Sequence, residues 1–200
     1  QGFLQGGSRR SLNVYCCFDN EEVGSRTRQG AASTFLIDTL RRITQAMALT
    51  EEDLQRALAS SLMISADNAH AVHPNVPEKS DPTNRVYLNQ GIVIKYNANQ
   101  SYTSDAISAA LFKELCAEVG VKTQYFTNRS DLKGGGTLGS ISTSQVSIAS
   151  VDIGLAQLAM HSCNETAGVE DSEAMILAIQ RFYSTHRSMP QEGVLIQQAD

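Results

Sequence analysis

The chain has 200 residues, of which 42% are hydrophobic and 18% charged, and its formal net charge is -5. This composition suits one soluble globular domain of ordinary size, with room for a second small one. The acidic balance and the absence of a long basic run argue against nucleic acid as a partner. No apolar stretch approaches the roughly 20 residues that cross a bilayer, and the start shows no signal-peptide pattern, so no membrane association is expected.

The predicted elements alternate between strands and helices. In the first part of the chain the pattern predicts a strand over residues 12–18, a helix over 31–49, a short helix from Glu51 capped by Thr50, and a strand over 61–65. After a loop over 73–85 it predicts a strand over 91–96, a helix over 104–119 closed by Gly120, strands over 122–127 and 146–153, and a helix over 170–183. This alternation favours an α/β sheet covered on both faces, in which sites gather at the carboxyl ends of strands.

Four cysteines, at positions 16, 17, 116 and 163, lack the density and spacing of a secreted disulfide framework. We therefore expect a reduced, cytoplasmic setting. The adjacent pair Cys16 and Cys17 lacks the C-x-x-C spacing of a zinc site, and we expect both side chains to pack as small hydrophobic groups in the first strand. No chemical role is assigned to any of the four.

Two adjacent acids, Glu21 and Glu22, stand between the first predicted strand and the first predicted helix. Side chains alternate along extended backbone, so one acid could hold a metal ion while the other handles a proton. Taken alone, such a pair most often lies on a solvated surface. Its interest comes from the other ligand-type residues of the chain.

Two further residues of metal-ligand type are Asp67, which follows the predicted strand over 61–65, and His161. Carboxylate oxygen and imidazole nitrogen suit zinc or a related divalent ion. Their wide separation in sequence leaves simpler roles open, because Asp67 could cap a turn and His161 could be a hydrogen-bonded core histidine.

The glycine-rich loop over residues 131–139 invites comparison with a phosphate-binding loop. It lacks the P-loop spacing and does not clearly link a strand to a helix, so no nucleotide site is expected. Flexible backbone near a substrate is the preferred interpretation.

Four strings occur in the order FDNEEVGS, SADNAHAVHPN, IKYNANQSYTSD and LAMHSCNETAG. Together they closely resemble the aspartyl aminopeptidases, a family of two-metal cytosolic exopeptidases, and the similarity runs from about residue 6 to about residue 183. The resemblance implies a zinc-exopeptidase-like catalytic domain, with a three-layer mixed sheet flanked by helices. The family also has a histidine, a metal-bridging aspartate and an inserted dimerisation domain upstream of the two glutamates, without counterparts here. We therefore expect residues 1–200 to correspond to the C-terminal portion of the catalytic domain.

The resemblance implies a role for each candidate residue of the metal site. Glu21 matches the general base, Glu22 and His161 match ligands of one ion, and Asp67 matches a ligand of the second. The expected cofactors are two divalent ions, zinc being the first choice.

The resemblance also implies a pocket for the substrate. Lys95 matches the contact to an acidic side chain, and His70 and Tyr102 match pocket positions that could orient the substrate through hydrogen bonds. Gly136 stands where the family commonly has serine, so a hydrogen bond from that hydroxyl is not expected.

The expected activity is therefore removal of N-terminal Asp or Glu from peptides by a zinc-dependent aminopeptidase that forms a homo-oligomer, a dodecamer in the family. Two alternatives stay open. The chain could be a non-catalytic structural or assembly fragment of such an enzyme, or part of a related two-metal deacylase or carboxypeptidase.

Overall fold

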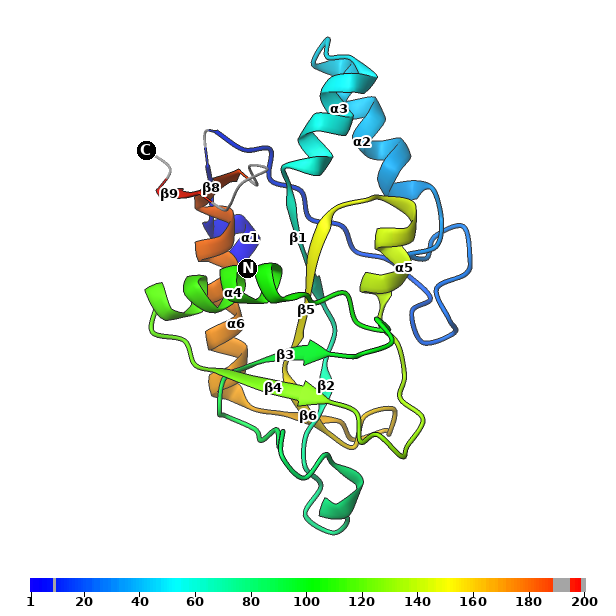
Figure 1. The fold of residues 1–200 in the computed structure, drawn as a ribbon, viewed down its shortest axis with the longest axis vertical. Helices are drawn as coiled ribbons and strands as arrows, with labels where there is room; N and C mark the ends of the chain where they lie inside the picture. Colours follow the sequence, from blue (N-terminus) through cyan, green and yellow to red (C-terminus); the bar gives the residue numbers. More distant parts are fainter. Residues whose placement is uncertain (9, 189–194, 199–200) are drawn as a thin grey trace.

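The computed structural model describes residues 1–8, 10–188 and 195–198 (Figure 1). Its largest sheet has four strands, which are β1 (Leu62–Ala66), β5 (Ala149–Gly154), β3 (Ile92–Tyr96) and β4 (Thr123–Thr127) in that spatial order. β1 runs parallel to β5 and β3 runs parallel to β4, whereas β3 and β5 are antiparallel. The sheet is mixed, as predicted, and each of these strands lies close to a predicted one.

Helices cover both faces of this sheet. Figure 1 shows α4 (Ala106–Glu118) and α6 (Val169–Tyr183) on one side of the β1–β5 pair and α5 (Leu138–Gln145) on the other. The main core lies between the sheet and the helices α4 and α6. It is formed by Ile92, Ile94, Ala109, Phe112, Leu115, Cys116, Val151, Ile153 and Ala178. Because side chains alternate along a strand, Lys95 and Asp152 belong to the opposite face.

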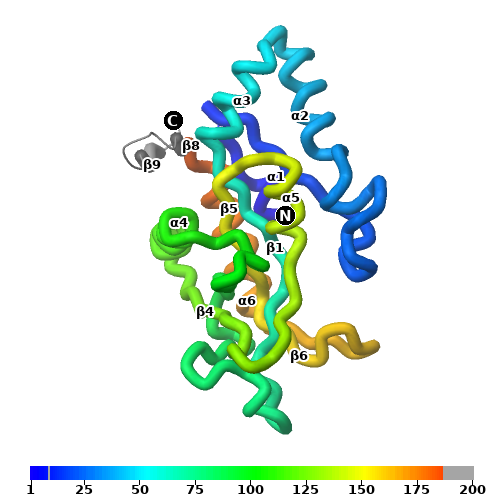
Figure 2. Tube along the Cα trace, turned by 45° about the vertical axis from the view of Figure 1, so that its right-hand side comes forward, coloured from blue at the N-terminus to red at the C-terminus, as the bar shows by residue number. Residues whose placement is uncertain are grey.

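The helices α2 (Phe35–Ala46) and α3 (Glu51–Ala59) form a hairpin that projects from one end of the sheet in both views (Figures 1 and 2). Thr50 caps α3 as predicted, and its side chain and that of Asp53 bond reciprocally to each other's backbone N–H. α2 is shorter than the predicted helix over 31–49. Its end is followed by Ala48 in the left-handed region, at φ 58°.

The predicted strand over residues 12–18 is wrong, because this segment is irregular and pairs with no strand among the described residues. An apolar run marks a segment that packs, whereas a strand also needs a neighbour with which to share its backbone hydrogen bonds. Here Cys16 and Phe18 pack against the core cluster beneath α2 and α3. Cys17 is exposed, so the expectation that both cysteines would pack holds for Cys16 alone.

The glycine-rich loop does connect a strand to a helix, contrary to the prediction, since it leads from β4 to α5. The sequence of α5, LGSISTSQ, is rich in serine and threonine and has little helical periodicity. The spacing argument against a P-loop is unaffected.

A second sheet extends the first beyond the carboxyl ends of β1 and β5. Its strands β2 (Ala69–His70), β6 (Ala156–Leu158) and β7 (Thr166–Ala167) lie in that order. The backbone N–H of Asp67 donates to the carbonyl of Ile153, which joins the two sheets. The remaining elements are α1 (Gly2–Gln5), the 3-10 helix η1 (Pro77–Lys79), and the antiparallel pair β8 (Thr185–Ser188) and β9 (Leu195–Gln198). Throughout the described residues, no helix has the length and apolar character needed to cross a membrane.

Candidate active site

A cavity of about 490 Å³ opens at the carboxyl ends of β1 and β3. The turn that follows residue 18, the glycine-rich loop, the loop before α4 and the loop between β6 and β7 also line it. The structure brings together around this cavity all the residues that the sequence singled out, namely Glu21, Glu22, Asp67, His70, Lys95, Tyr102 and His161.

The two adjacent glutamates lie on a tight turn. Asn20 begins it in the left-handed region at φ 58°, and the N–H of Ser25 donates to the carbonyl of Asn20 at 2.9 Å. The Oε2 atom of Glu22 lies 3.0 Å from the Nε2 atom of His161. Glu21 lies deeper, and burial raises the pKa of its carboxyl group, followed by the negative charges of Asp67 and Glu22.

His161 is presented by a strained loop between β6 and β7. Both Ala159 and His161 have positive φ, at 54° and 67°, a conformation that is unusual for residues with a side chain. The N–H of His161 donates to a carboxylate oxygen of Glu165 at 2.6 Å, and the N–H of Ser162 donates to the carbonyl of Ala159. These contacts fix the loop with its imidazole beside Glu22.

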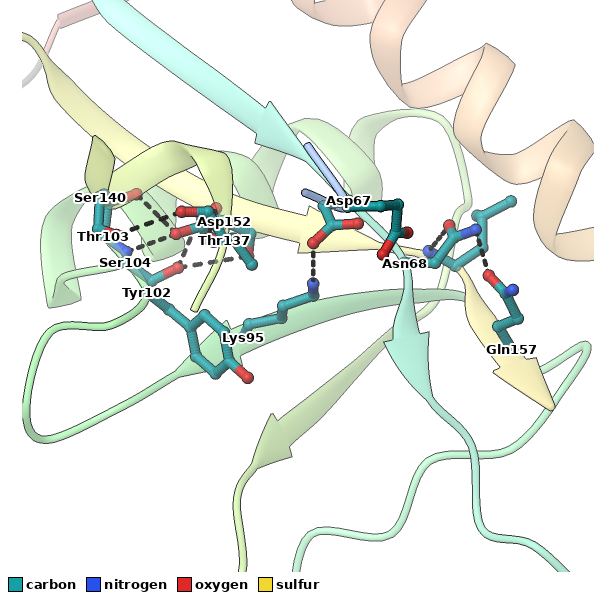
Figure 3. A network of polar contacts seen from close by, with 12 residues as sticks. Asp67, Asn68, Lys95, Tyr102, Thr103, Ser104, Thr137, Ser140, Asp152 and Gln157 are labelled. Carbon is teal, nitrogen blue, oxygen red and sulfur yellow. Dashed lines mark hydrogen bonds and ion pairs between the residues drawn. The ribbon is translucent and has the colours of Figure 1, made fainter. Parts of the chain in front are cut away.

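Lys95 is the buried cation of the cavity. Its side chain is 3% exposed, and its Nζ atom lies 3.4 Å from a carboxylate oxygen of Asp67 (Figure 3) and 5.5 Å from the ring centre of Tyr102. Burial lowers the pKa of the ammonium group, while the carboxylates of Asp67 and Asp152 oppose this shift. The neighbouring His70 has an exposed side chain, yet partial desolvation lowers the pKa of its imidazole, and the nearby His161 and Lys95 add to the shift.

One acid in this region was missed by the sequence analysis. Asp152 of β5 is fully buried and accepts hydrogen bonds from Thr103 and Thr137 (Figure 3). The signal that would have found it is a charged residue in the middle of the mostly apolar strand ASVDIG.

The donor atoms fit part of a zinc site. Zinc takes carboxylate oxygen and imidazole nitrogen at about 2.0–2.2 Å, so two such donors 3.0 Å apart, those of Glu22 and His161, can reach one ion. Within the described residues, no group of three or more His, Cys, Asp or Glu side chains is arranged to hold a metal, and Asp67 contacts Lys95 instead. The chain thus offers some of the ligands that a zinc ion requires.

A family model described as aminopeptidase I zinc metalloprotease, peptidase family M18, matches residues 6–183. This chain belongs to the M18 family. A probable M18 family aminopeptidase 2 from Clostridium novyi is 50% identical over 184 residues, which are 92% of this chain and 42% of that relative. The M18 chain described here therefore spans about two fifths of the length of the curated relatives that it matches.

Solved structures agree with the assignment to M18. The chain is similar to one in a complex of Ape4 and Nbr1, with 38% identity and a TM-score of 0.79, over 83% of this chain and 31% of that one. It is also similar to the S. cerevisiae mApe1 dodecamer, with 34% identity and a TM-score of 0.72, over 83% of this chain and 36% of that one. These likenesses confirm the predicted α/β fold with a mixed sheet between helices.

Proposed function

We propose that this M18 chain contributes to a zinc-dependent aminopeptidase that removes acidic residues, Asp or Glu, from the N-termini of peptides. The observation that carries the proposal is the convergence on one cavity of Glu21, the Glu22–His161 pair and the buried ammonium group of Lys95. Family membership supports the metallo-aminopeptidase chemistry. The acidic preference rests on Lys95 and on the resemblance described above.

Glu22 and His161 would hold one zinc ion, and Asp67 would be a ligand of a second. Two such ions, when bound, lower the pKa of a shared water molecule and polarise the carbonyl group of the scissile bond. The resemblance also implies a histidine and a bridging aspartate, which have no match in these residues, so the remaining ligands would come from outside them.

Glu21 would act as the general base. Its carboxylate accepts a proton from the attacking water and later passes it to the leaving amine. A raised pKa suits this role, because a base whose pKa lies nearer the working pH can both take and return a proton. The position of Glu21 next to Glu22 on one tight turn keeps the base close to the metal ligand.

Lys95 would select the substrate. An ammonium group carries three donors, so Lys95 can keep its contact to Asp67 and still bind the carboxylate of an N-terminal Asp or Glu. His70 and the hydroxyl of Tyr102, which accepts a hydrogen bond from the side chain of Asn128, would orient the same residue of the substrate. We further propose that the protein is a cytoplasmic homo-oligomer. The similar yeast structure, mApe1, is a dodecamer, which supports the oligomer.

The decisive experiment replaces the base and leaves the ligands in place. In a full-length form that carries the remaining ligands, we expect Glu21→Gln to keep its bound zinc and to lose aspartyl-peptide hydrolysis by at least about a hundredfold. Glu52→Gln, at an exposed position of α3, is the control and should change neither. Unchanged hydrolysis of an aspartyl peptide by Glu21→Gln would reject the assignment of the base.

A second candidate function is that of a non-catalytic assembly module. It is favoured by the incomplete metal-ligand set among the described residues. Zinc analysis and a peptidase assay compare the 200-residue chain with a longer form that supplies the remaining ligands. Full activity of the 200-residue chain alone would reject the non-catalytic module, and an inactive longer form would reject the enzyme. A panel of peptides with free and blocked termini in the same assay distinguishes an aminopeptidase from a deacylase or carboxypeptidase.

A further inference from the structure

Asp152 is a buried carboxylate that no step of the proposed reaction uses. It has 0% exposed surface and lies on the face of β5 that is opposite the main core. Its Oδ2 atom accepts hydrogen bonds from the N–H of Thr103 at 2.5 Å and from the hydroxyl of Thr103 at 3.0 Å. Its Oδ1 atom accepts a hydrogen bond from the hydroxyl of Thr137 at 3.0 Å. Such charge-assisted hydrogen bonds are the strong ones in a protein interior.

The two threonines belong to different walls of the cavity. Thr103 directly follows Tyr102, whose ring faces Lys95, and Thr137 ends the glycine-rich loop and is the N-cap residue of α5. Tyr102 and Thr137 both line the cavity. One carboxylate therefore ties together two chain segments that have no secondary structure of their own at these points (Figure 3).

The place of Asp152 in the sheet brings this tie next to Lys95. β3 and β5 are antiparallel, and Ile94 pairs with Ile153. Lys95 follows Ile94 and Asp152 precedes Ile153, so the two residues occupy neighbouring positions on adjacent strands. The space around the carboxylate is also restricted, since a Cβ atom on Gly139 would lie 2.5 Å and 2.8 Å from its two oxygens. Packing thus restricts the carboxylate, and from its observed position it reaches both walls.

We propose that Asp152 is a positioning residue for acidic-substrate selectivity, because it fixes the Tyr102 and Thr137 walls at the spacing that admits a carboxylate beside Lys95. The inference rests on the proposed function and adds to it a residue that does not touch the substrate. It requires that loss of the tie weakens binding of an acidic first residue more than binding of a neutral one of equal size.

The test uses two non-hydrolysable probes, Asp-Ala and Asn-Ala dipeptides with the peptide bond reduced to CH₂–NH. Their dissociation constants are measured by calorimetry with zinc present, for the whole chain and for Asp152→Asn. The wild type should prefer the aspartyl probe, and Asp152→Asn should lower that preference by about tenfold, the effect of one charge-assisted hydrogen bond.

A matched control exists in the same chain. Asp171 is 1% exposed and accepts hydrogen bonds from the N–H groups of Asn89 and Gly91, but it does not line the cavity. Asp171→Asn removes a second buried carboxylate and should lower the melting temperature while leaving the ratio of the two dissociation constants unchanged.

A second pair of variants separates position from charge. Thr137→Val removes the hydroxyl that bonds to Asp152 without changing any charge, and Thr137→Ser keeps it. We expect Thr137→Val to lose selectivity as Asp152→Asn does, and Thr137→Ser to retain it. This pair also decides the matter if Asp152→Asn does not fold.

The other outcomes overturn either the inference alone or the proposed specificity as well. A wild type without preference for the aspartyl probe overturns both the proposed acidic specificity and this inference. A wild-type preference that persists in Asp152→Asn or in Thr137→Val overturns the inference alone. Equal loss of affinity for both probes also overturns it, because that result indicates a purely structural role.

Discussion

The Nε2 atom of His161 lies 3.0 Å from the Oε2 atom of Glu22, a contact between a turn near the start of the chain and a loop near its end. Neither side chain is buried, with 61% and 71% of their surfaces exposed, so burial does not force them together. Exposed ion pairs contribute little to stability. The contact is better explained by two backbone turns that each aim a ligand-type side chain at the same point.

This pair predicts a measurable zinc affinity that depends on the imidazole. We expect His161→Ala to weaken zinc binding by at least about tenfold in calorimetric titration of the chain, because a carboxylate alone is a poor ligand set. His73→Ala is the matched control, since His73 lies outside the cavity and its ring accepts a hydrogen bond from the N–H of Asn75. Equal zinc affinity in wild type and His161→Ala would contradict the assignment of this ligand.

The carboxylate of Glu165 should matter for the same measurement without being a ligand. It accepts the N–H of His161 at 2.6 Å and so stabilises the positive φ of that residue. We expect Glu165→Ala to weaken zinc binding by several-fold, up to about tenfold, while Glu165→Gln, which keeps an acceptor oxygen, stays close to wild type. Ser162→Ala, which removes a contact to Asn164 in the same loop, serves as the control. Identical affinities for Glu165→Ala and wild type would show that the loop holds His161 without this contact.

Lys95 predicts a change in selectivity. Lys95→Met keeps the length and most of the volume of the side chain and removes the cation that would bind an acidic first residue. We expect the substitution to raise KM or lower turnover for aspartyl peptides more than for neutral ones. The loss of kcat/KM should differ between the two substrates by about tenfold or more. Comparable losses for acidic and neutral peptides would reject Lys95 as the selectivity element.

The sequence was sufficient for the elements that depend on local pattern. The strand at Ile92–Tyr96 and the helix at Ala106–Glu118 follow directly from an apolar run and from helical spacing with a terminal cap. Local pattern failed where structure depends on a partner. Residues 12–18 have the composition of a strand but no neighbouring strand in the described part of the chain. The helix α5, whose Ser and Thr residues are poor helix formers, packs on β1 and β5.

The residues of the candidate site also fall into those that local sequence reveals and those that depend on distant contacts. The candidate residues Glu22 and His161 were identified because their residue types and motifs are visible in the sequence, and the structure brings them to one cavity. Asp152 was not, because its importance comes from hydrogen bonds to Thr103 and Thr137, which lie far from it in sequence. Long-range contacts of this kind leave only a faint local signal, here a charge within an apolar strand.

Cys116 predicts how stability depends on alkaline pH. Burial among apolar side chains raises the pKa of its thiol to about 12, from an ordinary value of 9.0. Between these values the folded chain keeps a proton that the unfolded chain loses, so the free energy of unfolding falls as pH rises above 9, by roughly 2 kcal/mol between pH 9 and 10.5. Urea unfolding across this range should show a shallower decline for Cys116→Ala than for wild type. Cys163→Ala, at an exposed position, should decline like wild type, and parallel curves for all three would contradict the prediction.

Gly139 predicts a steric limit at the buried side of the cavity. A Cβ atom there would lie 2.6 Å from the hydroxyl of Ser65, as well as within 2.8 Å of both Asp152 oxygens. Both side chains are buried and cannot swing away, so we expect Gly139→Ala to lower the free energy of unfolding by about 1–3 kcal/mol despite the better helix propensity of alanine.

Gly135 is the matched control, because a Cβ atom on it meets nothing within 4 Å. Gly135→Ala should therefore leave the free energy of unfolding within about 0.5 kcal/mol of wild type. Urea unfolding of the two variants side by side tests the limit. If Gly139→Ala were as stable as Gly135→Ala, the sheet and α5 would have to move apart at Asp152, and the tight placement of that carboxylate would be wrong.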